Sequence, residues 1–194
     1  MQEYLQQCAS VDLDDFFDFV IGSASLDLEN APYGGYRFPV ETRMAGRLFS
    51  RFSIDMATGD VWIEPHEVVY PHEWLGFAGI ESPKIPLISM EQQFAEKLHA
   101  YTLPRERPNS RVKDIVDILA LIQTGQLDTE KLKMALKATF KRRKIHDFPP
   151  ILPDVPVNWT SPFKKMANEC NIDIEIERAI EDIKTFCNQH GLMK

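Results

Sequence analysis

The chain has 194 residues, a formal net charge of -7, and 44% hydrophobic and 26% charged residues. This composition is ordinary for a soluble globular protein and supplies a core for one domain or two small ones. The negative charge argues against nonspecific nucleic-acid binding over the whole surface.

The absence of targeting signals and the cysteine pattern limit the cellular setting. The sequence contains no apolar run of about 18 residues and no signal-peptide pattern, so we expect a cytoplasmic protein without a membrane partner. Cys8, Cys170 and Cys187 show no paired spacing. Reduced thiols are therefore expected, rather than a disulfide framework or a zinc site.

The first part of the chain predicts a short helix followed by an antiparallel sheet. Residues 1–10 have an amphipathic helix pattern, and residues 11–22 turn into a Phe/Val/Ile run that is typical of a strand. Alternating residues predict strands at 36–41 and 46–55, with a fourth possible at 61–63 and a surface turn at 26–30. In the segment 46–55 we expect Leu48, Phe52 and Ile54 on one face and Arg47, Arg51, Ser53 and Asp55 on the other.

Two helices follow a proline-rich and aromatic-rich connection at residues 64–88. Ser89 is the expected N-cap of the first helix, whose apolar stripe has Lys97 at its edge, and an arginine-rich loop at 104–108 ends it. The second helix is expected from residue 109 or 110 to Gly125. Its Asp114 and Asp117 lie opposite the apolar face, and therefore face either bulk water or a cleft.

The remainder of the chain predicts further helices. Asp128 is the expected cap of a helix that ends near residue 143, an extended proline-rich arm follows at 148–156, and helices are expected from residue 161 and over 172–190. Residues 131–144 contain seven Lys or Arg and no Asp or Glu. They form either a local phosphate contact or a solvated helix face. The fold class is therefore α+β, with a small, mostly antiparallel sheet region in 1–88 and a helical domain in 89–194.

Two motifs in the central helices resemble a known family. Residues 96–100, Glu-Lys-Leu-His-Ala, and 111–117, Arg-Val-Lys-Asp-Ile-Val-Asp, are similar to the signature of the AbiEii/AbiGii toxins. These are nucleotidyltransferases of the polymerase-β-like superfamily that act in bacterial toxin-antitoxin and abortive-infection pairs. Residues 32–41, 52–55 and 75–81 extend the resemblance, which implies that the sheet is part of a nucleotidyltransferase palm.

The resemblance implies roles for individual residues. Lys97 is expected to be catalytic and to contact the phosphates of an NTP, together with Arg111, and Asp114 is expected to position the reacting groups. Asp55 matches the third carboxylate of the family's magnesium site, although an Asp before a turn has the same pattern. The family's opening hairpin, Gly-Gly followed by Asp-x-Asp, is not found in this sequence, so the Mg²⁺ site is expected to be incomplete.

Two functions follow from this resemblance. The chain is either a nucleotidyltransferase toxin, impaired here, that transfers a nucleoside monophosphate from NTP to an RNA such as tRNA, or an inactive truncated homologue that binds nucleotide, RNA or an antitoxin. The absence of the hairpin also predicts an exposed sheet edge, and with it a homodimer or poor solubility.

Overall fold

The computed structural model describes residues 1–27, 34–59, 61–64, 66–74, 76–79, 81–105, 109–148 and 150–192. They form two compact units, residues 1–60 and 61–194, each with its own buried core. The units are defined by contacts. The predicted division into a sheet region, 1–88, and a helical domain, 89–194, stays a prediction.

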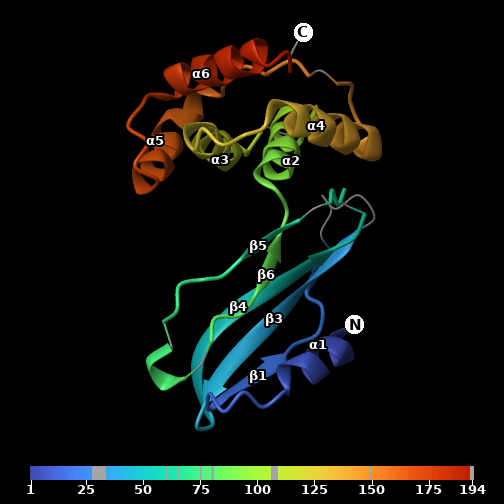
Figure 1. The fold of residues 1–194 in the computed structure, drawn as a ribbon, viewed down its shortest axis with the longest axis vertical. Coiled ribbons are helices and arrows are strands. Elements are labelled where there is room, and N and C mark those ends of the chain that lie inside the picture. Colours follow the sequence, from blue (N-terminus) through green and yellow to red (C-terminus); the bar gives the residue numbers. More distant parts are fainter. Residues whose placement is uncertain are drawn as a thin grey trace. The chain divides into compact units, whose positions relative to one another are not determined.

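The first unit is a sheet with one helix, α1 (Gln2–Ala9). Its strands are β1 (Phe17–Ile21), β2 (Leu26–Asp27), β3 (Gly35–Met44) and β4 (Arg47–Ala57), and all the pairings are antiparallel (Figure 1). β1 and β4 pair with the same residues of β3, so they lie on opposite edges of it. β2 pairs with the beginning of β3 on the same edge as β1.

α1 packs on one face of this sheet and also covers the outer edge of β1. Ile21, Phe38 and Val40 are buried there, with Leu5 of α1 packed against them. Gln6 accepts a hydrogen bond from the Ile21 N–H and donates one to the carbonyl of Phe19, each at 2.8 Å. The side chain of Gln2 donates to the Ile21 carbonyl at 2.9 Å. The N–H of Ile21 and the carbonyls of Phe19 and Ile21 on this edge are therefore satisfied by side chains of α1.

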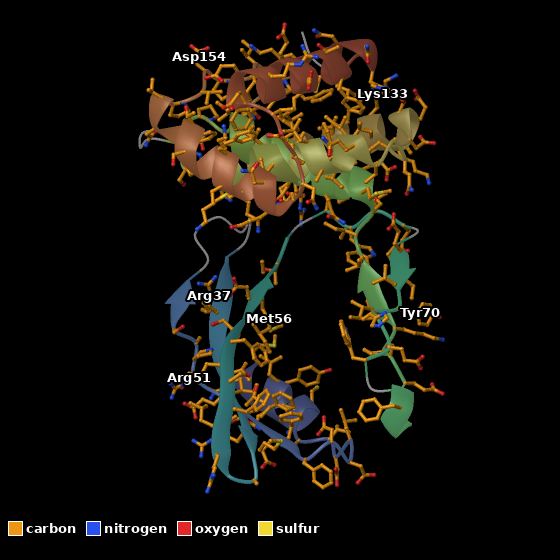
Figure 2. All side chains as sticks on the ribbon, turned by 90° about the vertical axis from the view of Figure 1, so that its left-hand side faces the viewer. Arg37, Arg51, Met56, Tyr70, Lys133 and Asp154 are labelled. Carbon is orange, nitrogen blue, oxygen red and sulfur yellow. The ribbon has the colours of Figure 1, made fainter. Side chains whose placement is uncertain are left out.

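The opposite face of the sheet is polar, as the alternation predicted. Figure 2 shows Arg37 and Arg51 on one side of the sheet and Met56 on the other. The prediction is wrong at the start of β4, where a register shift pairs Leu48 with Arg43 and Arg47 with Met44. Each of these two residues thereby lies on the face opposite to the expected one, because one extra residue inverts the alternation beyond it.

The strands also differ from the prediction at two other places. Residues 61–63 are not a strand, and the further strand is β2, at residues that we expected in a turn. Residues 28–30 of that turn lie outside the described part of the chain, as do 106–108 of the arginine-rich loop. The predicted connection at 64–88 contains a small hairpin of β5 (Glu67–Val69) and β6 (Ile85–Leu87), and a short 3-10 helix, η1 (Gly76–Ala78).

The second unit is built from α2 (Met90–Thr102), α3 (Val112–Gln123), α4 (Thr129–Arg143), α5 (Thr160–Glu169) and α6 (Ile176–Gln189) (Figure 1). The predicted caps are confirmed, because Ser89 accepts from the Gln92 N–H and Asp128 accepts from two N–H groups of α4. α5 begins at Thr160, after a 3-10 turn, η2 (Val157–Trp159), and α6 begins at Ile176, later than expected.

The core of this unit lies between the helices. α2 contacts both α3 and α4, and α3 contacts α5 and α6. The predicted apolar stripes are buried, and their most enclosed side chains include Phe94, Leu98, Tyr101, Ile115, Leu132, Leu136 and Ile183. The α+β prediction is confirmed. Among the described residues, no helix is long and apolar enough to cross a membrane.

Candidate functional site

The charged residues of the central helix pair form one cluster. The Nζ atom of Lys97 on α2 lies 2.5 Å from Oδ2 of Asp117 and 3.4 Å from Oδ1 of Asp114, both on α3. Arg111, the N-cap residue of α3, places a guanidinium nitrogen 3.8 Å from Oδ2 of Asp114. The structure therefore brings Lys97, Arg111 and Asp114 together, and their roles in a site stay a prediction.

Asp117 is the closest partner of Lys97, and the sequence analysis assigned it no role. The 100° helical rotation placed it on the side of Asp114, but the residue that α2 presents to that side depends on how the two helices pack. Asp117 is half-buried and lies one helical turn after Asp114, whereas Arg111 lies one turn before it.

Asp114 faces the interior rather than bulk water. Its side chain is 6% exposed, so the alternative of a solvated face is wrong for this residue. Burial raises the pKa of its carboxyl, and the charges of Lys97 and Arg111 oppose that rise. Oδ2 of Asp114 is buried and accepts no hydrogen bond within the described structure, although Lys97 and Arg111 both lie near this carboxylate.

Lys97 keeps its charge at the edge of this cluster. Burial lowers the pKa of its ammonium, but the hydrogen bond and charge of Asp117 and the charge of Asp114 outweigh burial and raise the pKa above its ordinary value. The side chain is 34% exposed. A charged ammonium that two carboxylates orient and that water can reach is suited to binding a phosphate group.

Arg105 adds to the positive charge around Asp114. It donates from one guanidinium nitrogen to the Ala100 carbonyl at 2.9 Å. Burial and the neighbouring charge of Arg111 lower the pKa of Arg105, while the charge of Asp114 opposes them. The cluster therefore holds three cationic side chains, from Lys97, Arg105 and Arg111, around one buried carboxylate.

Glu96, the residue before Lys97, links α2 to α4 through an ion pair. Glu96 forms an ion pair of 2.6 Å with Arg143 and accepts a hydrogen bond from Gln92, which also donates to Thr139 of α4. Sequence reasoning placed Arg143 in a solvated or phosphate-binding segment. The ion pair instead gives this arginine a structural partner inside the second unit.

The other basic residues of α4 remain at the surface. Lys137, Lys141 and Lys144 line a hollow of about 530 Å³ with Phe140, His146 and Phe148 among its other lining residues. A concave surface with several ammonium groups attracts anions. Arg143 is therefore paired rather than solvated, and a phosphate contact of the remaining basic residues stays a prediction.

Asp55 lies in the first unit, on the polar face of β4. Both of its carboxylate oxygens accept hydrogen bonds from Arg37, each at 2.6 Å, and the side chain is 44% exposed. This hydrogen bond lowers the pKa of Asp55. In the part of the chain that the structure describes, no group of three or more His, Cys, Asp or Glu could hold a metal ion.

Comparison with protein families gives a match over nearly the whole chain. The model of the nucleotidyl transferase AbiEii toxin of type IV toxin-antitoxin systems matches residues 1–185. The chain belongs to the AbiEii toxin family. No curated protein matches it. The AbiEii match includes Asp55 and the entire Lys97 cluster, and a toxin of this kind is paired with an antitoxin.

Proposed function

We propose that this AbiEii chain transfers a nucleoside monophosphate from an NTP to a hydroxyl of an RNA acceptor, such as tRNA, with release of pyrophosphate. The observation that carries the proposal is the cluster in which Asp114 and Asp117 orient the half-exposed ammonium of Lys97 beside Arg111. Phosphoryl transfer needs positive charge that is fixed in position before the reaction, because negative charge spreads over the phosphoryl oxygens in the transition state.

In the proposed reaction, Lys97 and Arg111 bind the triphosphate. Lys97 is long and only half-buried, so its ammonium can contact a phosphate oxygen while its stem stays against α3. Arg111 offers a planar set of donors that suits a second phosphate. Asp114 and Asp117 hold the lysine in one orientation, so Asp114 positions the reacting groups through Lys97.

Mg²⁺ is the proposed cofactor, because hard oxygen ligands and a triphosphate favour this ion. When bound, it supplies positive charge to the triphosphate and to the attacking oxygen. Asp55 is the proposed ligand, but it does not make a magnesium site by itself, since both of its oxygens are hydrogen-bonded to Arg37.

The RNA acceptor is proposed to contact α4. Lys137, Lys141 and Lys144 supply the ammonium groups around the hollow at the end of this helix. Phosphate contacts from lysine provide affinity without base specificity, and their contribution falls with added salt. RNA binding is therefore expected to weaken strongly as ionic strength rises.

The test is transfer of label from each of the four NTPs to tRNA in the presence of Mg²⁺. The chain is expected to label the RNA, and Lys97→Ala is expected to lose about 10³-fold or more of that activity. Lys165→Ala is the matched control, because it removes an exposed lysine of α5, outside the cluster. Equal activity of the Lys97→Ala and unmodified chains contradicts the proposal.

A second candidate is a module that binds nucleotide, RNA or the antitoxin without turnover. The pairing of Asp55 with Arg37 favours it, as does the lack of a three-ligand metal group among the described residues. Binding of a labelled, nonhydrolysable NTP, measured beside the transfer assay, distinguishes the binding module from the transferase. NTP binding that needs Lys97, without any label in RNA, selects the binding module, whereas label in RNA selects the transferase.

A further inference from the structure

The outer edge of β4 is an exposed feature of the first unit. β4 pairs with β3 along one edge, and no strand within the described residues pairs with the other. The outer edge of β1, in contrast, is covered by Gln2 and Gln6 of α1. An uncovered edge of this length is a template for another strand.

The backbone directions of β4 follow from Pro39. The carbonyl of Pro39 accepts from the Gly22 N–H at 2.8 Å, toward the β1 edge, and proline has no N–H to donate. Pro39 is paired with Ser53, so this pair exchanges no hydrogen bond between β3 and β4. The N–H and C=O of Ser53 therefore point to the free edge. By the alternation of an antiparallel ladder, those of Arg51 and Asp55 do so as well.

We propose that β4 pairs with β4 of a second copy of the chain, antiparallel and centred on Ser53, so that two sheets become one. In this register, Ser53 lies opposite Ser53 of the second copy, and Arg51 lies opposite Asp55. These three pairs use the outward backbone groups of all three residues, and form about six hydrogen bonds. The proposal concerns assembly and does not depend on the transferase activity.

The side chains of the polar face support this register. Within one chain Glu41 is paired with Arg51, and Arg37 with Asp55, both across β3 and β4. Placing Arg51 opposite the second copy's Asp55 joins the two pairs into one row across four strands, with the charges in the order minus, plus, minus, plus. Opposite charges on directly facing residues stabilise a sheet, whereas like charges destabilise it.

The apolar face supports the same register. Val40 is paired with Phe52, and Phe38 with Ile54. The proposed pairing places Phe52 opposite the second copy's Ile54, which gives a row of four apolar side chains. Phe52 is 47% exposed in the single chain and gains cover in the dimer. Shifting the register by two residues toward the N-terminus places Arg51 opposite Arg51, so charge and burial favour one register.

The first experiment measures the mass of the full chain by sedimentation over a wide range of protein concentration. A reversible dimer is expected. Ser53→Pro removes an outward N–H and leaves the β3 ladder intact, so it is expected to weaken the dimer by about tenfold or more. Ser53→Lys places two ammonium groups opposite each other, with the same direction of effect. Ser53→Thr keeps the N–H and is the matched control, which is expected to dimerise.

Cross-linking tests the register itself, and it remains informative where a variant of the first experiment does not fold. Ser53→Cys, with Cys8 and Cys170 replaced by serine, is expected to form a disulfide between copies, because directly paired residues lie about 5.5 Å apart between Cα atoms. Ser50→Cys in the same background is the control, and it is expected not to form one. A chain that stays monomeric at all concentrations, a dimer that persists in folded Ser53→Pro and Ser53→Lys, or equal cross-linking at both positions overturns the proposal.

Discussion

Replacing Lys97 with methionine tests whether the charge cluster is coupled as its geometry indicates. The substitution keeps an apolar stem but removes the ammonium beside Asp117 and Asp114. Removing one partner of a fully buried ion pair costs roughly 3–5 kcal/mol. Here Lys97 is 34% exposed and Arg111 remains near Asp114, so we expect a loss of about 1–3 kcal/mol in the free energy of unfolding.

The assay is urea unfolding, followed by a probe of the helical unit. Lys133→Met is the matched control, because Lys133 is also 34% exposed but pairs with the exposed Glu130. It is expected to cost no more than about 0.5 kcal/mol. Adding Asp114→Asn to Lys97→Met is expected to recover part of the loss, since it removes the buried carboxylate that the lysine had offset.

The same variant has a defined pH dependence. Burial raises the pKa of Asp114 in the folded state, so ionising this carboxyl costs stability as pH rises from its unfolded pKa through its folded one. The charge of Lys97 opposes this cost. Lys97→Met is therefore expected to raise the folded-state pKa of Asp114 further and to widen the pH range over which stability is lost. Its loss of stability is expected to be smaller in mildly acid than in neutral solution. Equal losses of stability in Lys97→Met and Lys133→Met at neutral pH, with no recovery by Asp114→Asn, would refute the coupling.

Substitutions at three further positions test other contacts. Ser89→Ala removes the N-cap of α2 and is expected to cost about 1 kcal/mol in urea unfolding, while Ser89→Asp is expected to cost little. Glu96→Gln removes the carboxylate that pairs with Arg143 at 2.6 Å, and a loss of about 1–3 kcal/mol in the free energy of unfolding is expected. No measurable loss contradicts the stabilising role of this contact between α2 and α4. Arg37→Ala is expected to return the pKa of Asp55 upward toward its ordinary value, as followed by carboxyl NMR, and an unmoved pKa contradicts the pairing.

Local rules predicted the helical part of the fold well. Ser89 and Asp128 are caps because a side-chain oxygen next to a helix start satisfies free N–H groups, whatever lies around it. The apolar stripe of α3 was also correct, because burial follows helical periodicity. These features depend on a few neighbouring residues, which the sequence displays directly.

Pairing across long distances was harder to predict. β2 consists of Leu26–Asp27, a stretch too short to show alternation, and it is a strand only because β3 lies beside it. The shift near Leu48 inverts two residues, and no glycine or proline within β4 marks it.

The candidate site was predicted in part. The family motif placed Lys97 and Asp114 together, but it did not reveal the contact with Asp117 or the pairing of Arg37 with Asp55. Those contacts depend on how helices and strands face one another, and spacing along one element does not specify this.

Two ion pairs, Lys97–Asp117 and Glu96–Arg143, join α2 to its neighbouring helices. Glu96 and Lys97 are consecutive, yet one is tied to α4 and the other to α3. A substitution at Glu96 is therefore expected to release α2 from α4 while the pairing of Lys97 with α3 stays in place. The contacts of α2 with its two neighbouring helices can thus be weakened one at a time, although the two side chains that make them are adjacent in the sequence.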